Sequence, residues 1–166
     1  ELLFNGANGS TIIDSTGRHT PSLSPSGTRT IVSDRLQVGG GGFIRADAAN
    51  TVNQDFNFTG KDFSISFDMQ PTSSGGTWIF KKTSQDAAGS GSPYLVFFWD
   101  TQLAFRSNNG QDIVTYSAPS TLVGVSTKVE IKRTGTTFQM LINDVVVDTQ
   151  VYNEAQRAID FSSQNY

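Results

Sequence analysis

The sequence predicts an all-β protein, a two-sheet antiparallel sandwich, on three observations. Apolar residues recur at period two in several short runs, and Gly, Asn, Asp or Pro bound most of these runs. Charged residues make up only 16% of the 166 residues, which suits strands and turns better than helices. We expect roughly ten to twelve strands, which favours two packed sheets over a single open one.

The first third of the chain is predicted to hold short extended segments. Residues 2–4 form an apolar strand closed by an Asn-Gly turn, and residues 11–13 form a second strand that ends in a turn beginning at Asp14. Residues 18–35 are rich in Ser, Thr and Pro, so we expect an irregular surface crossing there. Extended structure resumes at residues 36–38 and, after four glycines, at residues 43–44.

The middle of the chain contains the clearest single strand, at residues 62–70. Its Phe, Ile, Phe and Met side chains share one face, while Ser, Ser, Asp and Gln share the other. Pro71 follows the strand and cannot donate to a sheet ladder, so the strand stops before it. Further strands are predicted at residues 77–80, at residues 94–99 and 103–105 as a hairpin, and at residues 113–116.

Residues 127–149 predict three strands joined by two tight turns. Val129 and Ile131 alternate with charged residues, and a segment containing Gly135 supplies the first turn. Apolar residues then repeat at period two up to Asn143-Asp144, which supplies the second turn before three valines. Only residues 153–159 have helical character, so the prediction includes at most one short helix, near the C-terminus.

Composition excludes several functional classes. The net charge is -3 and the longest basic run is Lys81-Lys82, so the electrostatic footprint of a nucleic-acid-binding protein is absent. The sequence has no long apolar span, and we therefore predict no membrane insertion. There are no cysteines, which excludes disulfides and thiolate metal sites.

The ordered strand series resembles a known family. The segments DFSISFDMQP, TWIFKK, YLVFFWDTQLAFRS and VEIKRTGTTFQMLINDVVVD are similar to the laminin G-like, concanavalin A-like lectin/glucanase superfamily. The opening ELLFNGANGSTIIDSTGRH resembles the start of laminin G-like modules in bacteriophage virion (capsid or tail) proteins. The resemblance covers residues 2 to 151 and implies a jelly roll of two curved antiparallel sheets, a fold often used for glycan or protein recognition.

The resemblance also implies an incomplete sandwich. We expect residues 1–166 to be a single laminin G-like domain, part of a longer chain whose closing C-terminal strands are missing after Tyr166. In that family the last strand pairs near the amino-terminal strand, so Leu2, Leu3 and Phe4 would lie at a poorly protected edge. We therefore predict that these three residues form an assembly edge, covered by a neighbouring subunit or by missing chain.

Catalytic chemistry is not apparent in the sequence. Retaining glycoside hydrolysis needs two carboxyl groups about 5 Å apart, and no E-x-D-x-x-E pattern is present to place them on one strand. Glu130 stands between two apolar residues, and no acid lies between Asp62 and Asp68. His19, the sole histidine, lies in a Pro/Ser-rich segment without a G-x-S-x-G motif. We predict that the protein is not an enzyme.

Calcium is the one metal to consider, because oxygen ligands suit it and cysteine is absent. Related laminin G-like modules hold calcium at the rim of the sandwich. The candidate ligands in predicted loops are Asp86, Asp100 and Asp112, although their spacing follows no known calcium motif. The alternative is that they are ordinary solvated turn residues, and no other cofactor is predicted.

Aromatic residues are the remaining binding candidates. Phe97 and Trp99 share one face of their predicted strand, and Phe98 lies on the other face. One face must line the core between the sheets, and the other is covered by a loop or forms a stacking platform for sugars. We predict core packing for Phe97, Phe98 and Trp78. The candidate glycan-binding residues are Trp99, Tyr116, Asn108 and Asn109.

These observations favour a non-catalytic structural or adhesion domain of a phage virion protein. It would decorate a capsid or belong to a tail fibre, contact other virion subunits in a homo- or hetero-oligomer, and bind host-surface glycans. The alternative is a carbohydrate-binding module of a secreted bacterial protein, and a glucanase is the least favoured hypothesis. The predicted location is the virion, with secretion as the alternative.

Overall fold

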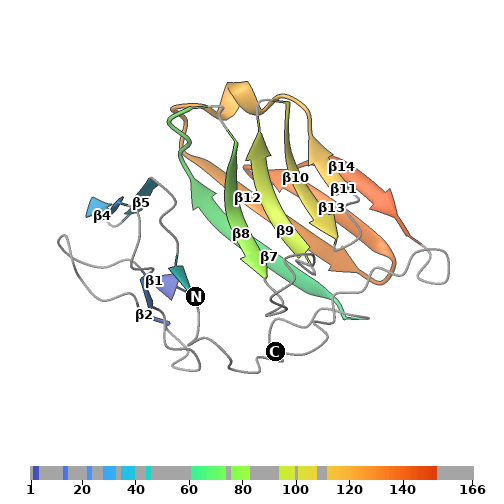
Figure 1. Cartoon of the computed structure of the whole chain (residues 1–166). Coiled ribbons are helices and arrows are strands. Elements are labelled where there is room, and N and C mark those ends of the chain that lie inside the picture. The colour runs from blue at the N-terminus through green and yellow to red at the C-terminus, as the bar shows by residue number, and fades with distance from the viewer. Residues whose placement is uncertain are drawn as a thin grey trace, which may run out of the picture. The chain divides into compact units, whose positions relative to one another are not determined.

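The computed structural model places the following residues: 2–3, 13–14, 22–23, 28–32, 35–39, 44–45, 61–73, 76–82, 94–99, 101–107 and 112–152. The chain divides into two compact units, Glu1–Val52 and Asn53–Tyr166, and each is described by itself (Figure 1). A single domain over residues 1–166 stays a prediction.

The first unit contains three antiparallel strand pairs. They are β1 (Leu2–Leu3) with β2 (Ile13–Asp14), β3 (Ser22–Leu23) with β6 (Ile44–Arg45), and β4 (Thr28–Val32) with β5 (Arg35–Gly39). The expectation of an irregular crossing over residues 18–35 is wrong where β3 and β4 lie. The strand β4 is rich in β-branched residues, and Val32 pairs with Arg35 across a two-residue connection, which together make a hairpin.

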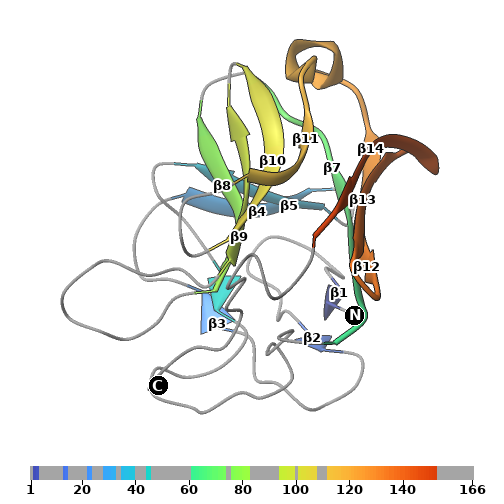
Figure 2. The same ribbon diagram turned by 90° about the vertical axis from the view of Figure 1, so that its right-hand side faces the viewer.

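The second unit consists of two four-stranded antiparallel sheets. The front sheet has the order β11-β10-β9-β8 and the back sheet has the order β14-β13-β12-β7. The front strands are β8 (Thr77–Lys82), β9 (Tyr94–Trp99), β10 (Gln102–Ser107) and β11 (Asp112–Tyr116). The back strands are β7 (Phe63–Met69), β12 (Thr127–Thr134), β13 (Thr137–Ile142) and β14 (Val145–Val151). Figure 2 shows the two sheets from the side, facing one another.

The predicted all-β class is confirmed in the part of the chain that the structure describes. The one helical element found there is a 3₁₀ turn, Pro119–Leu122, which joins the front sheet to the back sheet. The helix predicted at residues 153–159 lies outside the described residues. None of the described helices has the length and apolarity that crossing a membrane requires.

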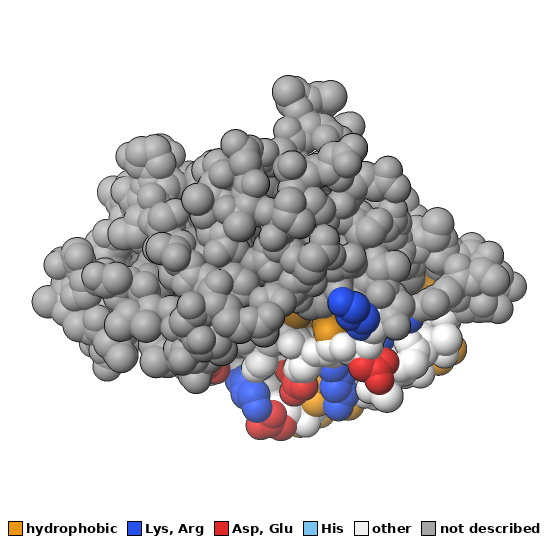
Figure 3. Space-filling model, turned by 90° about the horizontal axis from the view of Figure 1, so that it is seen from below, with side chains coloured by type: hydrophobic (Ala, Val, Ile, Leu, Met, Phe, Trp, Pro, Cys, Tyr) orange, Lys and Arg blue, Asp and Glu red, His pale blue; other side chains and the backbone are white. Residues whose placement is uncertain are grey.

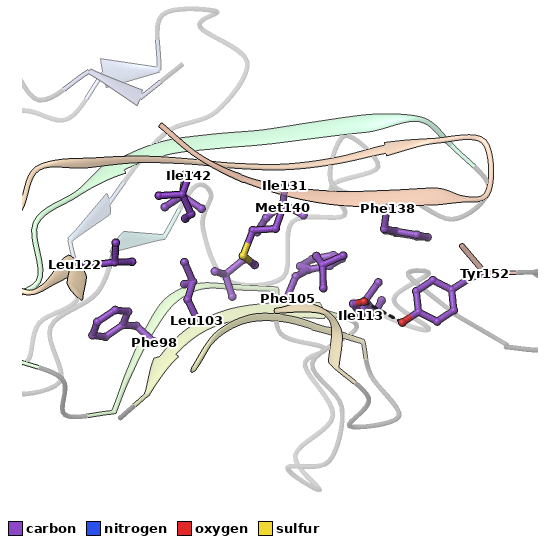
Figure 4. Close-up of a cluster of buried hydrophobic side chains, with 13 residues drawn as sticks. Phe98, Leu103, Phe105, Ile113, Leu122, Ile131, Phe138, Met140, Ile142 and Tyr152 are labelled. Atoms are coloured by element: carbon purple, nitrogen blue, oxygen red, sulfur yellow. Dashed lines mark hydrogen bonds between the residues drawn. The ribbon is translucent and has the colours of Figure 1, made fainter. Parts of the chain in front are cut away.

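The main core lies between the two sheets (Figure 4). Its fully buried side chains come from both sheets: Val96, Phe98, Leu103, Phe105, Val114, Val129, Ile131, Phe138 and Met140. Burial of each such side chain contributes about 1.5–3 kcal/mol. The predicted inner face of β7 packs against this cluster, and the ring of Phe63 lies 5.9 Å from that of Phe105. Hydrophobic alternation therefore predicted the packed face of this strand correctly.

The two predicted hairpin turns of the back sheet are present. Asn143 and Asp144 have φ values of 50° and 66°, the pair of positive values that a two-residue type I′ turn requires. Asn and Asp tolerate this left-handed region better than other non-glycine residues. In the first hairpin Gly135 takes a φ of 58°, which costs glycine nothing.

Side chains join the edge strands of the two sheets where β11 and β14 approach. The Asp148 carboxylate accepts a hydrogen bond from the backbone N–H of Thr115 at 2.8 Å. The hydroxyl of Tyr152 donates to the carbonyl of Ile113 at 2.9 Å, the dashed line in Figure 4. These bonds satisfy backbone groups on the outer side of an edge strand, which blocks pairing with another strand there.

Candidate functional site on the outer face of the front sheet

The outer face of the front sheet carries the predicted aromatic platform. Phe98 and Leu103 are directly opposite one another and both point into the core, so their neighbours along β9 and β10 point outward. Direct cross-strand pairs on the outer face are Trp99 with Gln102 and Phe97 with Ala104. We call Phe97, Trp99, Gln102, Arg106 and Asp112 the outer-face cluster.

Trp99 is the last residue of β9, and its indole is held on two sides. Its ring lies edge-on to Phe97, with 5.3 Å between centroids and 77° between planes. It also rests against the backbone at Gly76, where a Cβ atom would approach the indole Cε2 to 2.6 Å. Only glycine leaves room for the ring in this position. The side chain is nevertheless 40% exposed.

Phe97 is buried although it lies outside the core between the sheets. It is 1% exposed and forms a second, small buried cluster with Ala104. The guanidinium carbon of Arg106 lies 4.5 Å from the centroid of its ring, within the range of a cation–π interaction. The prediction that Phe97 is buried is thus confirmed, but it packs on the outer face and not between the sheets. The side chain of Trp78, also predicted to pack in the core, lies outside what the structure describes.

A β-bulge brings Asp112 into the outer-face cluster. Phe105 pairs with Val114 but Arg106 pairs with Asp112, so the register shifts by one residue at Ile113. Ile113 and Val114 are consequently both buried in the core. The Asp112 carboxylate accepts from Arg106 Nε at 2.5 Å through one oxygen.

The other oxygen of the Asp112 carboxylate accepts from the amide of Gln102 at 2.7 Å. The side chains of Arg106 and Asp112 are 31% and 25% exposed, so water reaches this ion pair. The polar part of the cluster therefore carries one positive and one negative charge.

Tyr116 lies at the same end of the front sheet as Trp99 but on the opposite face. It is paired with Leu103, which points into the core, and its ring packs against that core. Its hydroxyl lies 3.1 Å from the Thr121 hydroxyl oxygen. The structure therefore does not bring Trp99 and Tyr116 together on one surface. The two-residue spacing of Val114 and Tyr116 is the sequence signal that places both side chains on one face of their strand.

The predicted metal ligands are not assembled in the described part of the chain. Asp112 is engaged with Arg106 and Gln102. Asp86 and Asp100 lie outside the described residues, as do Asn108 and Asn109, the two predicted glycan-binding asparagines. Within those residues no three His, Cys, Asp or Glu side chains come together to hold a metal ion. Calcium binding stays a prediction.

The predicted assembly edge lies in the first unit. Leu2 and Leu3 form β1, and they pair with Asp14 and Ile13 of β2. Phe4 lies outside the described residues. The pairing fixes a neighbour for β1 on one side, and the role of these residues in assembly stays a prediction.

The acids considered for glycoside hydrolysis each have a different partner. Glu130 accepts a hydrogen bond from the Ser64 hydroxyl at 2.9 Å, and Asp62 accepts from the Gly135 backbone N–H at 2.7 Å. Asp68 lies opposite Lys128 on the outer face of the back sheet. Acidic and basic side chains are interleaved on the described surface in Figure 3. This arrangement is typical of a solvated sheet face.

One buried charge lies elsewhere, at the end of β12. Arg133 is 6% exposed, donates through Nε to the Gly135 carbonyl at 2.7 Å, and lies 5.3 Å from the centre of the Phe138 ring. Burial lowers the pKa of Arg133, and the charge of Asp62 opposes this shift. The short hydrogen bond and the ring contact indicate a structural role at the hairpin.

The residues predicted from the sequence do not include Gly76, Gln102 or Arg106. Gln102 could have been found, because a two-residue turn after Trp99 places it directly opposite the indole. The contribution of Gly76 depends on a contact between strands and leaves no local signal. Comparisons with family models, with curated proteins and with solved structures each find no match to this chain.

Proposed function

We propose that this chain is a non-catalytic structural and adhesion domain of a phage virion protein, with a laminin G-like jelly-roll fold. It contacts other virion subunits, as a capsid decoration or within a tail fibre, and presents a surface for host glycans. The strand-by-strand resemblance supports the family. The two facing antiparallel sheets of the second unit support the sandwich.

The observation that carries the proposal is the apolar surface of β14. The exposed apolar side chains on this edge strand are Val145 (64%), Val146 (46%), Val147 (36%) and Val151 (70%). Single exposed apolar residues need no explanation, but several on one edge strand indicate a contact surface. Burying them against another subunit removes this apolar area from water.

The valines are arranged to contact a partner on both faces of the strand. Val145 lies opposite Ile142 and Val146 lies opposite Leu141, so these neighbours point to different sides of the sheet. A register shift between Met140 and Leu141 then places Val147 in the bulge. A subunit that wraps this edge would cover all four side chains.

Charge substitution on β14 tests assembly. We expect Val146→Asp and Val151→Lys to prevent the chain from entering virions, because each buries an unpaired charge at the contact. Ser66→Lys is the control, since Ser66 is an exposed polar residue on β7, the opposite edge strand of the same sheet. Copy number in purified particles is the measurement, with circular dichroism to confirm folding.

Wild-type chain in stoichiometric copy number in virions, lost in the valine variants, would support the proposal. Absence of the wild-type chain from particles would contradict it. So would normal incorporation of both charged valine variants.

The alternative function is a carbohydrate-binding module of a secreted bacterial protein. The exposure of Trp99 favours it, because indole rings commonly stack on sugars. Glycan binding by the chain together with its absence from virions would favour this alternative over the first proposal.

A further inference from the structure

Trp99 has the properties of a preorganised stacking surface. The indole lies against Gly76 and is nearly perpendicular to the Phe97 ring, yet 40% of the residue remains exposed. Phe97 beneath it is 1% exposed, so the support is itself buried. A ring already fixed by packing loses little conformational freedom when a ligand stacks on it.

Hydrogen-bonding groups lie beside the indole. Gln102 is the direct cross-strand neighbour of Trp99, which places their Cβ atoms about 4.5–5.5 Å apart. Its amide nitrogen donates to Asp112, so the amide oxygen remains as an acceptor. Arg106 lies over the ring of Phe97, which itself contacts the indole, and it binds Asp112 through Nε, which leaves its terminal nitrogens as donors.

The charge of the cluster selects against charged ligands. Arg106 and Asp112 form an ion pair, so these two charged side chains of the outer-face cluster carry no net charge between them. An acidic ligand would approach the Asp112 carboxylate and a basic ligand would approach the guanidinium. A neutral ligand with an apolar face and a polar edge fits better than either.

A sugar ring has this combination, because its C–H groups form an apolar face and its hydroxyls both donate and accept around the edge. We propose that Trp99, supported by Gly76 and bordered by Gln102 and Arg106, is a subsite for a neutral hexopyranose unit of a glycan. The inference rests on the adhesion role proposed above and deepens it by naming the residues and the ligand class. Tyr116 takes no part, because it packs on the opposite face of the sheet.

The test is binding of the purified chain to an array of neutral hexasaccharides of glucose, galactose, mannose and N-acetylglucosamine. A sialylated trisaccharide is the acidic comparison. We expect at least one neutral hexasaccharide to bind more tightly than the sialylated probe. Trp99→Ala should weaken that binding at least about tenfold in isothermal titration.

Two further variants separate stacking from a general loss of structure. Gly76→Ala keeps the tryptophan but adds a Cβ where the indole lies, so it should weaken binding severalfold by displacing the ring. Trp99→Phe keeps an aromatic face and should retain part of the affinity. Ser66→Ala, on the exposed outer side of β7, is the control and should bind like the wild type.

The inference is overturned if no neutral hexasaccharide binds at millimolar concentration. It is overturned equally if a folded Trp99→Ala or Gly76→Ala variant binds like the wild type. Virion incorporation of the Trp99→Ala variant distinguishes the two proposals. If the wild-type chain enters virions at normal copy number but binds no glycan, the subsite is refuted and the assembly role stands.

Discussion

The outer faces of the two sheets differ, although their inner faces share one core. On the back sheet the outward residues of β7 and β12 include Ser64, Ser66, Lys128 and Glu130, which are exposed or half-buried. On the front sheet the outward position 97 holds a phenylalanine that is 1% exposed. The side chains alternate between inward and outward in both sheets. The outward side chains of the back sheet nevertheless lie in solvent, whereas those of the front sheet form a second packed layer. The outer face that carries packed aromatic residues is the better candidate for recognition.

The ion pairs on the two faces show the same difference. Arg106 and Asp112 are 31% and 25% exposed, and the guanidinium lies over the Phe97 ring. Lys128 and Asp144 are 45% and 71% exposed, with 2.6 Å between nitrogen and oxygen. The hydrogen bond and charge of Asp144 raise the pKa of Lys128. Solvent screening makes the second pair the weaker contribution to stability.

Phe97→Ala should cause the largest loss in the free energy of unfolding, and it tests whether the outer face of the front sheet is a packed layer. Truncating a buried phenylalanine costs about 3–5 kcal/mol of unfolding free energy. Ser66→Ala on the exposed back face should change it by no more than about 0.5 kcal/mol. Urea unfolding of both variants measures the contrast. A cost for Phe97→Ala as small as that of Ser66→Ala would remove the distinction between the faces.

Tyr152→Phe tests the link between the two sheets. The substitution removes a buried hydrogen bond to the Ile113 carbonyl, and we expect a loss of about 1–3 kcal/mol. Tyr116→Phe is the matched control, because the Tyr116 hydroxyl bonds to Thr121 in an exposed position and its removal should cost less. Thermal unfolding measures both. Equal shifts in the melting temperature would show that the link adds nothing beyond an ordinary tyrosine contact.

Asp112→Asn sharpens the comparison of the two ion pairs. The asparagine keeps an acceptor but removes the charge opposite Arg106, and we expect a loss of about 0.5–1 kcal/mol. The loss should shrink at high salt, since screening already weakens a partly exposed pair. Urea unfolding at low and high salt is the measurement. A stability equal to wild type at low salt would show that the pair contributes nothing.

Lys128→Gln should cause the smallest loss of stability among these variants. The raised pKa of Lys128 means that its pairing with Asp144 stabilises the fold fully below the ordinary pKa of lysine, and this stabilisation is lost as the pH rises through the higher pKa of the folded state. The variant should therefore differ from wild type slightly at neutral pH and not at all at strongly alkaline pH. Melting temperatures across this range are the check. A difference that grows with pH would have the wrong sign.

Much of the second unit could be predicted from the sequence. The alternation of β7 identified its buried face, and Asn143-Asp144 identified a turn, because both signals are local. The strand β4 was missed, since its β-branched residues lie among Ser, Thr and Pro without a clear period. In the candidate site Trp99 was identified as an exposed aromatic, whereas Gly76 and Arg106 were not.

The sequence by itself determined where the strands and turns of the second unit lie, since each depends on neighbouring residues. Only the tertiary structure decided which face of β9 meets the opposite sheet, because both faces of that strand are aromatic. It also decided the bulge at Ile113 that places Asp112 opposite Arg106. These features depend on register between strands, and register is settled by packing across the whole sheet rather than by any one segment.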